Sequence, residues 1–234
     1  TMGMSIQMKT RVLCYHCIGS PKEPFYIRKT TRTIMNYTDY LHHEPGRIMC
    51  APSIFEEAWV YNEKIPQTPN PMNKRFMIRR KQCTFGATYN FSGQKSQGIP
   101  YDDWPLLAKI VLKDVREHSG SDLYNVVHTN WYPDGRAGLD PHADNETDMI
   151  PDMDIYSYTF ISNPQNPRGF QFYTYDDIKH PVGEVLLGYG DMLIMKKGMQ
   201  QKFKHGVKKS TAKKFENVRR LNMTVRAWKN DKLC

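Results

Sequence analysis

The chain has 234 residues, of which 39% are hydrophobic and 12% aromatic, and its formal net charge is +9. This composition excludes wholesale disorder and suits one globular domain with a sizeable core. We find no apolar run long enough to span a membrane and no signal-peptide pattern. We therefore expect an intracellular protein of the nucleus or the cytoplasm, with no membrane partner, that acts as a monomer.

The cysteines predict reduced thiols. Cys14, Cys17, Cys50, Cys83 and Cys234 are odd in number and scattered, as is common in intracellular proteins. The stretch Cys14-Tyr-His-Cys17 has the spacing of half a zinc site, but no second C-x-x-C accompanies it. A structural zinc site is therefore the less favoured interpretation.

In the N-terminal half, residues 53–63 are predicted to form a helix. Ser53 is an N-cap candidate, and Glu56, three residues later, completes a capping box. Three prolines follow, and they exclude a helix and predict an extended loop: Pro66, Pro69 and Pro71.

Residues 79–93 combine a basic start with spaced aromatic side chains. Arg79, Arg80 and Lys81 lead, and the aromatic residues that follow are Phe85, Tyr89 and Phe91. Basic groups for phosphates and aromatic faces for bases are combined in nucleic-acid sites. A strand that buries alternate aromatic residues would give the same pattern, so both interpretations stay open here.

The second half of the chain predicts one more helix and then strands. Apolar residues at 107, 110, 111 and 115 form a helical stripe that Gly120 ends. Strands are expected at 123–130, 155–162, 168–175, 184–188, 191–195, 201–207 and 218–228. Many short strands after helices indicate an α+β protein, mainly β, with a jelly-roll core.

Positive charge is concentrated between residues 196 and 220, where ten Lys and Arg residues accompany one acidic residue, Glu216. A clustered basic field is typical of nucleic-acid binders, although a solvated basic face would look the same. Arg219 in this cluster is expected to contact phosphate or to be solvated.

Three residues have the types and spacing of a metal site. His142 and Asp144 are two residues apart, so they point the same way on an extended strand, and His205 supplies a second imidazole. Two histidines and one carboxylate form the facial triad that holds Fe(II) and leaves positions open for a co-substrate and O2. Arg220 and Arg226 suit the anchoring of a dicarboxylic co-substrate, because a guanidinium pairs bidentately with a carboxylate.

Several motifs resemble the AlkB branch of the 2-oxoglutarate- and Fe(II)-dependent dioxygenases. The first combines H-x-D at 142–144, a distal His at 205 and R-x-N-x-T-x-R at 220–226. The second is N-x-Y-x-D-G at 130–135. The third, R-K-Q-x-T-F-G followed by Y-N-F-S-G, is similar to the DNA-repair members. The resemblance is specific from about residue 80 to residue 228 and faint before that.

The resemblance implies a double-stranded β-helix core with N-terminal helices and a nucleotide-recognition lid. We therefore expect residues 1–50 to form an extension of unknown role and 51–122 to form the helical support and the lid. Residues 123–234 would then form the Fe(II)/2-oxoglutarate core.

The resemblance also implies roles for site residues. The catalytic iron ligands would be His142, Asp144 and His205. The 2-oxoglutarate contacts would be Asn130, Tyr132, Arg220, Asn222, Thr224 and Arg226. The substrate contacts would be Met72, Arg80, Gln82, Tyr89, Phe91, Asn145 and Glu146. Among these, Phe91 is expected to stack on a flipped base and Met72 to act as a wedge that opens a duplex.

Two features depart from the family pattern. Asn145 is an amide where family members keep an acid, and the stretch 162–167 is longer than the usual short turn.

The implied function is oxidative demethylation of N-alkylated bases in single- or double-stranded DNA, or in RNA. Such an enzyme uses Fe(II), O2 and 2-oxoglutarate and releases formaldehyde and succinate. Two alternatives stay open. One is a 2-oxoglutarate-dependent hydroxylase that acts on protein or forms a modified base. The other is a non-catalytic nucleic-acid-binding module with a decayed iron site.

Overall fold

The computed structural model describes residues 36–70, 73–91, 94–96 and 98–229, with the backbone alone at 89–91 and 94–96. The pair Cys14 and Cys17, the wedge candidate Met72 and the first 35 residues lie outside the described part, as do the side chains of Tyr89 and Phe91. Within the described residues, no helix combines the length and the apolar character needed to cross a membrane.

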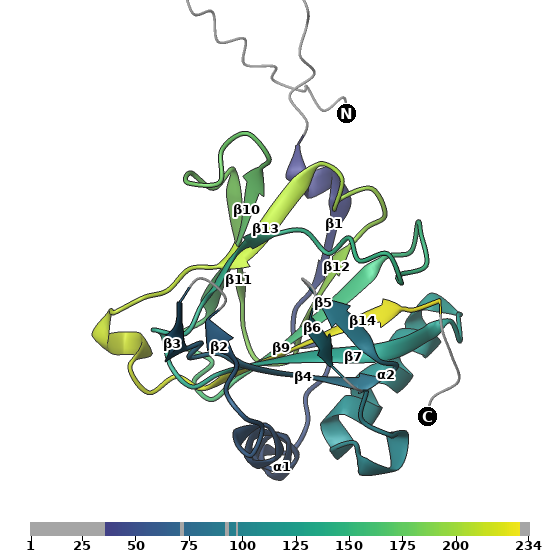
Figure 1. Cartoon of the computed structure of the whole chain (residues 1–234), viewed down its shortest axis with the longest axis horizontal. Coiled ribbons are helices and arrows are strands. Elements are labelled where there is room, and N and C mark those ends of the chain that lie inside the picture. The colour runs from purple at the N-terminus through teal and green to yellow at the C-terminus, as the bar shows by residue number, and fades with distance from the viewer. Residues whose placement is uncertain (1–35, 71–72, 92–93, 97, 230–234) are drawn as a thin grey trace, which may run out of the picture. The chain divides into compact units, whose positions relative to one another are not determined.

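Two antiparallel sheets form the body of the molecule (Figure 1). The large sheet has the strand order β1 (Leu41–Glu44), β12 (Asp191–Met195), β9 (Ile155–Ile161), β14 (Arg220–Ala227), β7 (Tyr124–Tyr132) and β4 (Lys81–Gly86). The small sheet has the order β11 (Gly183–Leu187), β10 (Arg168–Thr174), β13 (Phe203–Val207) and β8 (Leu139–His142). This arrangement confirms the expected jelly-roll core.

Shorter elements complete the fold. Two ribbons pair β2 (Pro69–Asn70) with β3 (Asn73–Met77) and β5 (Tyr89–Phe91) with β6 (Gln94–Ser96). Short 3-10 helices span Tyr37–Tyr40, Tyr101–Asp103 and Lys213–Phe215. The loop expected at the prolines therefore contains β2.

Helices α1 (Pro52–Glu63) and α2 (Leu106–Ser119) pack on one face of the large sheet, opposite the small sheet in Figure 1. Alternation along the strands explains the two faces. On β7 and β14, Val127, Trp131 and Val225 belong to the core that the helices cover, whereas Tyr132 belongs to the core between the sheets. His128 and Asn130 of β7 and the polar residues of β14 share the inner face with Tyr132, so the fold directs them toward the small sheet.

The two predicted helices have different outcomes. Helix α2 ends just before Gly120, as the sequence predicts, and Gly120 adopts the left-handed conformation (φ 66°) that favours glycine. The capping box predicted at Ser53 is wrong: α1 begins at Pro52, and its N-cap, Ala51, makes no side-chain hydrogen bond. Pro52 starts the helix because its fixed φ suits the first turn and its missing N–H would have no helical partner.

The strands predicted from residue 123 onward all form, with ends shifted by a few residues; β1 is absent from the prediction, and so is β8. This strand contains Pro141, a residue that is unfavourable within sheets, and it lies at the edge of the small sheet. Local pattern therefore gives it a weak signal. The omission matters because β8 carries His142.

Candidate active site

The three residues expected to bind metal meet at the small sheet. His205 on β13 is paired in register with His142 on β8, and Asp144 follows two residues after His142. Their potential ligand atoms all lie within 4.8 Å of one another. Asp144 and His205 are buried, whereas the His142 side chain is 22% exposed. One side of the cluster therefore stays accessible.

The surroundings orient both imidazoles. His142 Nδ1 lies 3.0 Å from the carbonyl oxygen of Asp140. A carbonyl can only accept, so Nδ1 carries a proton, and Nε2 lies 3.5 Å from Asp144 Oδ1. The His205 ring is stacked on Phe170 with centroids 5.2 Å apart. Each ring is thus held in place before a metal arrives.

The charge states of these groups also suit a metal. Burial lowers the pKa of His205 to about 3, so this imidazole is neutral. Burial alone would raise the pKa of Asp144. The guanidinium of Arg226, with its Nη2 atom 2.7 Å from Asp144 Oδ2, is the largest of the effects that outweigh burial and hold that pKa well below its usual range.

A second group of buried donors surrounds Arg220. This residue is fully buried, and its Nη2 donates to Thr159 Oγ1 at 3.1 Å. Among the described residues, no acceptor meets Arg220 Nε or Nη1 with good hydrogen-bond geometry, and the hydroxyl of Tyr132 interacts with this guanidinium. The guanidinium lies 4.9 Å from the Tyr132 ring centroid. A buried cation with unused donors is costly unless an anion pairs with it, so this group fits a carboxylate ligand.

Arg168, which the sequence interpretation missed, closes this region from β10. It is buried, and it donates to the carbonyl oxygens of Asp134 (3.2 Å), Gly135 (3.3 Å) and Lys208 (2.7 Å). Burial and then the charge of Arg220 lower its pKa to about 10. Arg168 therefore links the turn after β7 to the end of β13.

Asn222 and Thr224 face the interior but bond mainly within the large sheet. The amide nitrogen of Asn222 donates to Ser157 Oγ at 2.8 Å and to the carbonyl oxygen of Tyr158 at 2.9 Å. Thr224 Oγ1 donates to Asn222 Oδ1 at 3.4 Å. The structure thus gives both residues a link to β9, and their expected contact with a co-substrate stays a prediction.

A small cavity lies beside the metal cluster. Its lining comprises Arg80, Gln82, His128, Asn130, Leu139, His142, Asp144 and Arg226. Its volume of about 20 Å³ holds about one water molecule. The structure thereby brings Arg80, Gln82 and Asn130, which are distant in sequence, to the metal cluster. A larger ligand requires these side chains to move apart.

His128 in this cavity is a polar residue that the sequence interpretation missed. Its Nδ1 atom lies 3.0 Å from Thr84 Oγ1. Burial, with the charges of Arg226 and Arg80, lowers its pKa well below the usual value, so the ring is neutral. Its position two residues before Asn130 on β7 was the available signal, because alternation places both on the inner face.

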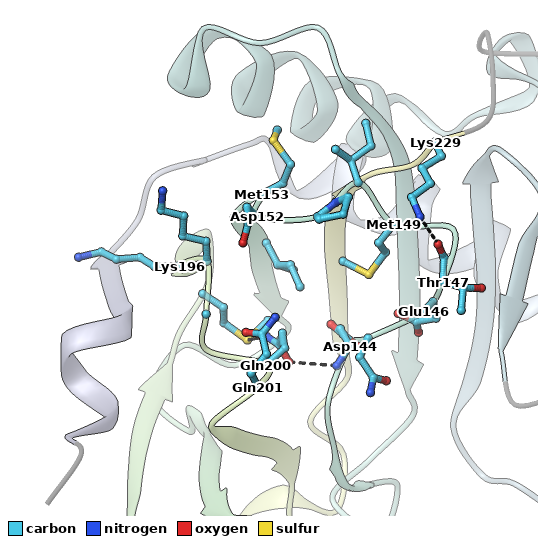
Figure 2. Close-up of a pocket in the computed structure, with 17 residues that line it drawn as sticks. Asp144, Glu146, Thr147, Met149, Asp152, Met153, Lys196, Gln200, Gln201 and Lys229 are labelled. Carbon is cyan, nitrogen blue, oxygen red and sulfur yellow. Dashed lines mark hydrogen bonds between the residues drawn. The ribbon is translucent and has the colours of Figure 1, made fainter. Parts of the chain in front are cut away.

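A larger cavity of about 280 Å³ also reaches Asp144 (Figure 2). Asn145 and Glu146, both expected to contact substrate, line it. Its apolar lining comprises Met149, Ile150, Pro151, Met153, Ile155 and Met195, and its lysines are Lys196, Lys197 and Lys229. Gln200, also missed from sequence, accepts a hydrogen bond from the Asp144 backbone N–H at 3.0 Å.

Arg219 has a different role from the one expected. It forms an ion pair with Glu56 on α1, with Nη1 donating to Oε2 at 2.8 Å, and its guanidinium lies 5.1 Å from the Trp59 ring centroid. Arg219 is therefore an ion-paired rather than a freely solvated charge, and a phosphate contact stays a prediction. Tertiary packing brings Glu56 to it, which no local pattern could indicate.

Residues 36–226 match the family model described as the 2OG-Fe(II) oxygenase superfamily. The chain belongs to this superfamily. The superfamily uses Fe(II), 2-oxoglutarate and O2, and the assembled His-Asp-His cluster fits the iron. The chain is therefore a 2-oxoglutarate- and Fe(II)-dependent dioxygenase, and the alternative of a non-catalytic module is set aside.

Among solved structures, 156 chains match this chain. One is a prolyl hydroxylase from Trichoplax adhaerens in complex with a hypoxia inducible factor oxygen degradation domain peptide fragment. It is 13% identical to this chain, with a TM-score of 0.50, and the match covers 82% of this chain and 84% of that one. At this identity the likeness concerns the fold alone. No curated protein sequence matches the chain.

Proposed function

We propose that this oxygenase belongs to the AlkB branch and oxidatively demethylates N-alkylated bases in DNA or RNA. The observation that carries the proposal is that Arg80 and Gln82 line the same cavity as His142 and Asp144. Both residues come from the R-K-Q stretch that resembles the DNA-repair members. Strand β4 brings them there by pairing with β7, where Gln82 lies opposite Asn130.

In this proposal the chain's own residues hold the metal and the co-substrate. His142, Asp144 and His205 bind Fe(II); burial, which keeps His205 neutral, and Arg226, which keeps Asp144 ionised, support this role. Arg220 and Tyr132 bind one carboxylate of 2-oxoglutarate, and Asn130 and Arg226 bind nearer the metal. When bound, Fe(II) with O2 and 2-oxoglutarate supplies the oxidation of a C–H bond, coupled to the conversion of 2-oxoglutarate to succinate and CO2.

The larger cavity is the proposed binding site of the methylated base. Its apolar side chains exclude water beside Asp144, and Asn145 and Glu146 offer polar groups to the edge of a base. A methyl group inside a duplex cannot reach a buried metal, so the base has to be flipped or already unpaired. After hydroxylation of the N-methyl group, the hydroxymethyl product separates into formaldehyde and the unmodified base.

Two further features support a nucleic-acid substrate. The net charge of +9 favours a polyanionic partner. Strand β4 also continues almost directly into the β5–β6 ribbon, which contains the backbone of Tyr89 and Phe91. Their stacking on a base and the wedge at Met72 are proposals that rest on the sequence.

Mass spectrometry can test the proposal. The enzyme is incubated with Fe(II) and 2-oxoglutarate and with methylated DNA or RNA oligonucleotides, single- or double-stranded, or with proline-containing peptides. We expect loss of the methyl group from an oligonucleotide, with formaldehyde and succinate as co-products, and no product with His142→Ala. Oxygen addition to a peptide without any oligonucleotide demethylation would instead establish a protein hydroxylase.

A further inference from the structure

Arg80 is a buried cation whose charge is surrounded by amides. The residue is 8% exposed, and its Nη1 donates to Gln82 Oε1 at 2.7 Å and also to Asn130 Oδ1. Among the described residues no carboxylate forms an ion pair with Arg80. Its role is therefore different from that of Arg79, the neighbouring residue, whose half-exposed side chain pairs with Asp134.

The chemistry of the guanidinium fixes both amides in one orientation. Arginine has only donors, so the amide atom that faces it must be oxygen in Asn130 and in Gln82. Each amide then turns its NH2 group away from Arg80. Among the described residues neither NH2 group has a protein acceptor, and neither is sealed from the space around it. Both side chains line the cavity that also contains Asp144.

We propose that Arg80 is a positioning residue that orients the amides of Asn130 and Gln82 as donors toward the 2-oxoglutarate carboxylate bound beside Asp144. This proposal rests on the co-substrate role given to Asn130 under the proposed function, and it is independent of the nucleic-acid substrate. Without Arg80 each amide can rotate by half a turn and present its oxygen to the carboxylate, which repels it. Arg80 removes that unproductive orientation in advance.

Burial argues against the simpler role of Arg80 as a contact to a nucleic-acid phosphate. A phosphate of a strand on the surface cannot approach a guanidinium that is buried and already bonded to two amides. The first arginine of the same stretch, Arg79, is on the surface. Arg80 therefore acts inside the cavity, through its neighbours.

The first test uses Asn130→Asp, which replaces the donor NH2 group by an oxygen while keeping the size of the side chain. The new carboxylate pairs with Arg80, so the melting temperature should be unchanged or higher. Titration calorimetry of 2-oxoglutarate into the Mn(II)-loaded protein should show a loss of affinity of about tenfold or more. Wild-type affinity in this variant would overturn the proposal.

The second test removes the guanidinium with Arg80→Met. Co-substrate affinity should fall about tenfold, and the absorption of the anaerobic Fe(II)–2-oxoglutarate complex should weaken at a given co-substrate concentration. Arg79→Met is the matched control and should bind 2-oxoglutarate as wild type does. Arg220→Lys is the positive control for lost binding, because an ammonium cannot pair bidentately with a carboxylate.

A double-mutant cycle separates positioning from direct contact. If Arg80 acts through Asn130, the loss in Arg80→Met/Asn130→Ala is smaller than the product of the two single losses. Independent losses would overturn the proposal and make Arg80 a direct ligand of the co-substrate. Arg80→Met would also overturn it if its 2-oxoglutarate affinity were unchanged while a separate assay showed weaker oligonucleotide binding. Because no nucleic acid is present in these titrations, failure of the demethylase proposal would not alter their outcome.

Discussion

At the scale of single residues, Asp144 has two roles, one as a metal ligand and one as a counter-ion that stabilises the fold. Its carboxylate lies where a metal ligand is needed, and it also neutralises the buried guanidinium of Arg226. Both ion-pair side chains are almost inaccessible to solvent. Removing one partner of such a pair leaves a buried charge without compensation, which costs about 3–5 kcal/mol. His142, at the accessible edge of the cluster, has no such second role.

This difference predicts separable effects of two ligand substitutions. Asp144→Ala and His142→Ala should both abolish succinate production, measured by mass spectrometry. In urea denaturation of the metal-free protein, Asp144→Ala should lower the free energy of unfolding by about 3–5 kcal/mol, and His142→Ala should lower it much less. Asp144→Asn, which keeps an acceptor for Arg226, should fall between them. Equal stability of all variants would refute the counter-ion role.

At the scale of secondary-structure elements, α1 is fastened to the start of β14 by Arg219. The guanidinium pairs with Glu56 on the first turns of the helix and lies over the rings of Phe55 and Trp59. The next residue, Arg220, begins the strand that carries the buried arginines. Helix α1 thereby supports the large sheet from the face opposite the active site.

We predict that Arg219→Ala destabilises the protein by about 1 kcal/mol, the usual size of a partly exposed ion pair with cation–π contacts. Glu56→Ala should cost less, and the double variant should cost less than the sum of the two, because the residues share one interaction. Urea denaturation provides the measurement. Oligonucleotide affinity should not change; a clear loss of affinity in Arg219→Ala would restore a phosphate contact.

At the scale of the whole molecule, the positive charge is unevenly placed. Lys208, Lys209 and Lys214 border a cavity of about 600 Å³ at the small sheet, beyond the strand that carries His205. On α2, which covers the other face of the large sheet, Lys113 faces Glu117 at 3.6 Å. A polyanion is therefore expected to be attracted more strongly to the lysines at the small sheet than to α2.

This asymmetry predicts which lysines bind nucleic acid. Lys208→Gln/Lys209→Gln should weaken oligonucleotide binding and reduce the slope of log K against log salt by about 0.7–0.9 for each phosphate that is no longer neutralised. Lys109→Gln/Lys113→Gln on α2 changes the net charge equally and should leave the slope unchanged. Fluorescence anisotropy across a salt series gives both slopes. Equal effects of the two double variants would show that net charge alone, without a docked strand, causes the binding.

The metal cluster, the arginine-bearing strand, the strand-rich core and α2 can all be predicted from the sequence. These features have short-range signatures: ligand types at fixed spacing, alternation along a strand, and a glycine that ends a helix. These signatures predict that His142, Asp144 and His205 come together at one metal site. They also predict that Arg220 and Arg226 lie on the same face of their strand. The structure places all five where these patterns require.

The surroundings of that cluster could not be predicted in this way, because they depend on tertiary contacts. Three contacts join residues far apart along the chain. Arg80 pairs with Asn130, Arg219 pairs with Glu56, and Arg168 donates hydrogen bonds to the turn after β7. Such contacts depend on which strands become neighbours and in what register, and no local pattern encodes either. The buried side of the site, where an unpaired charge is costly, is therefore the part that the fold alone specifies.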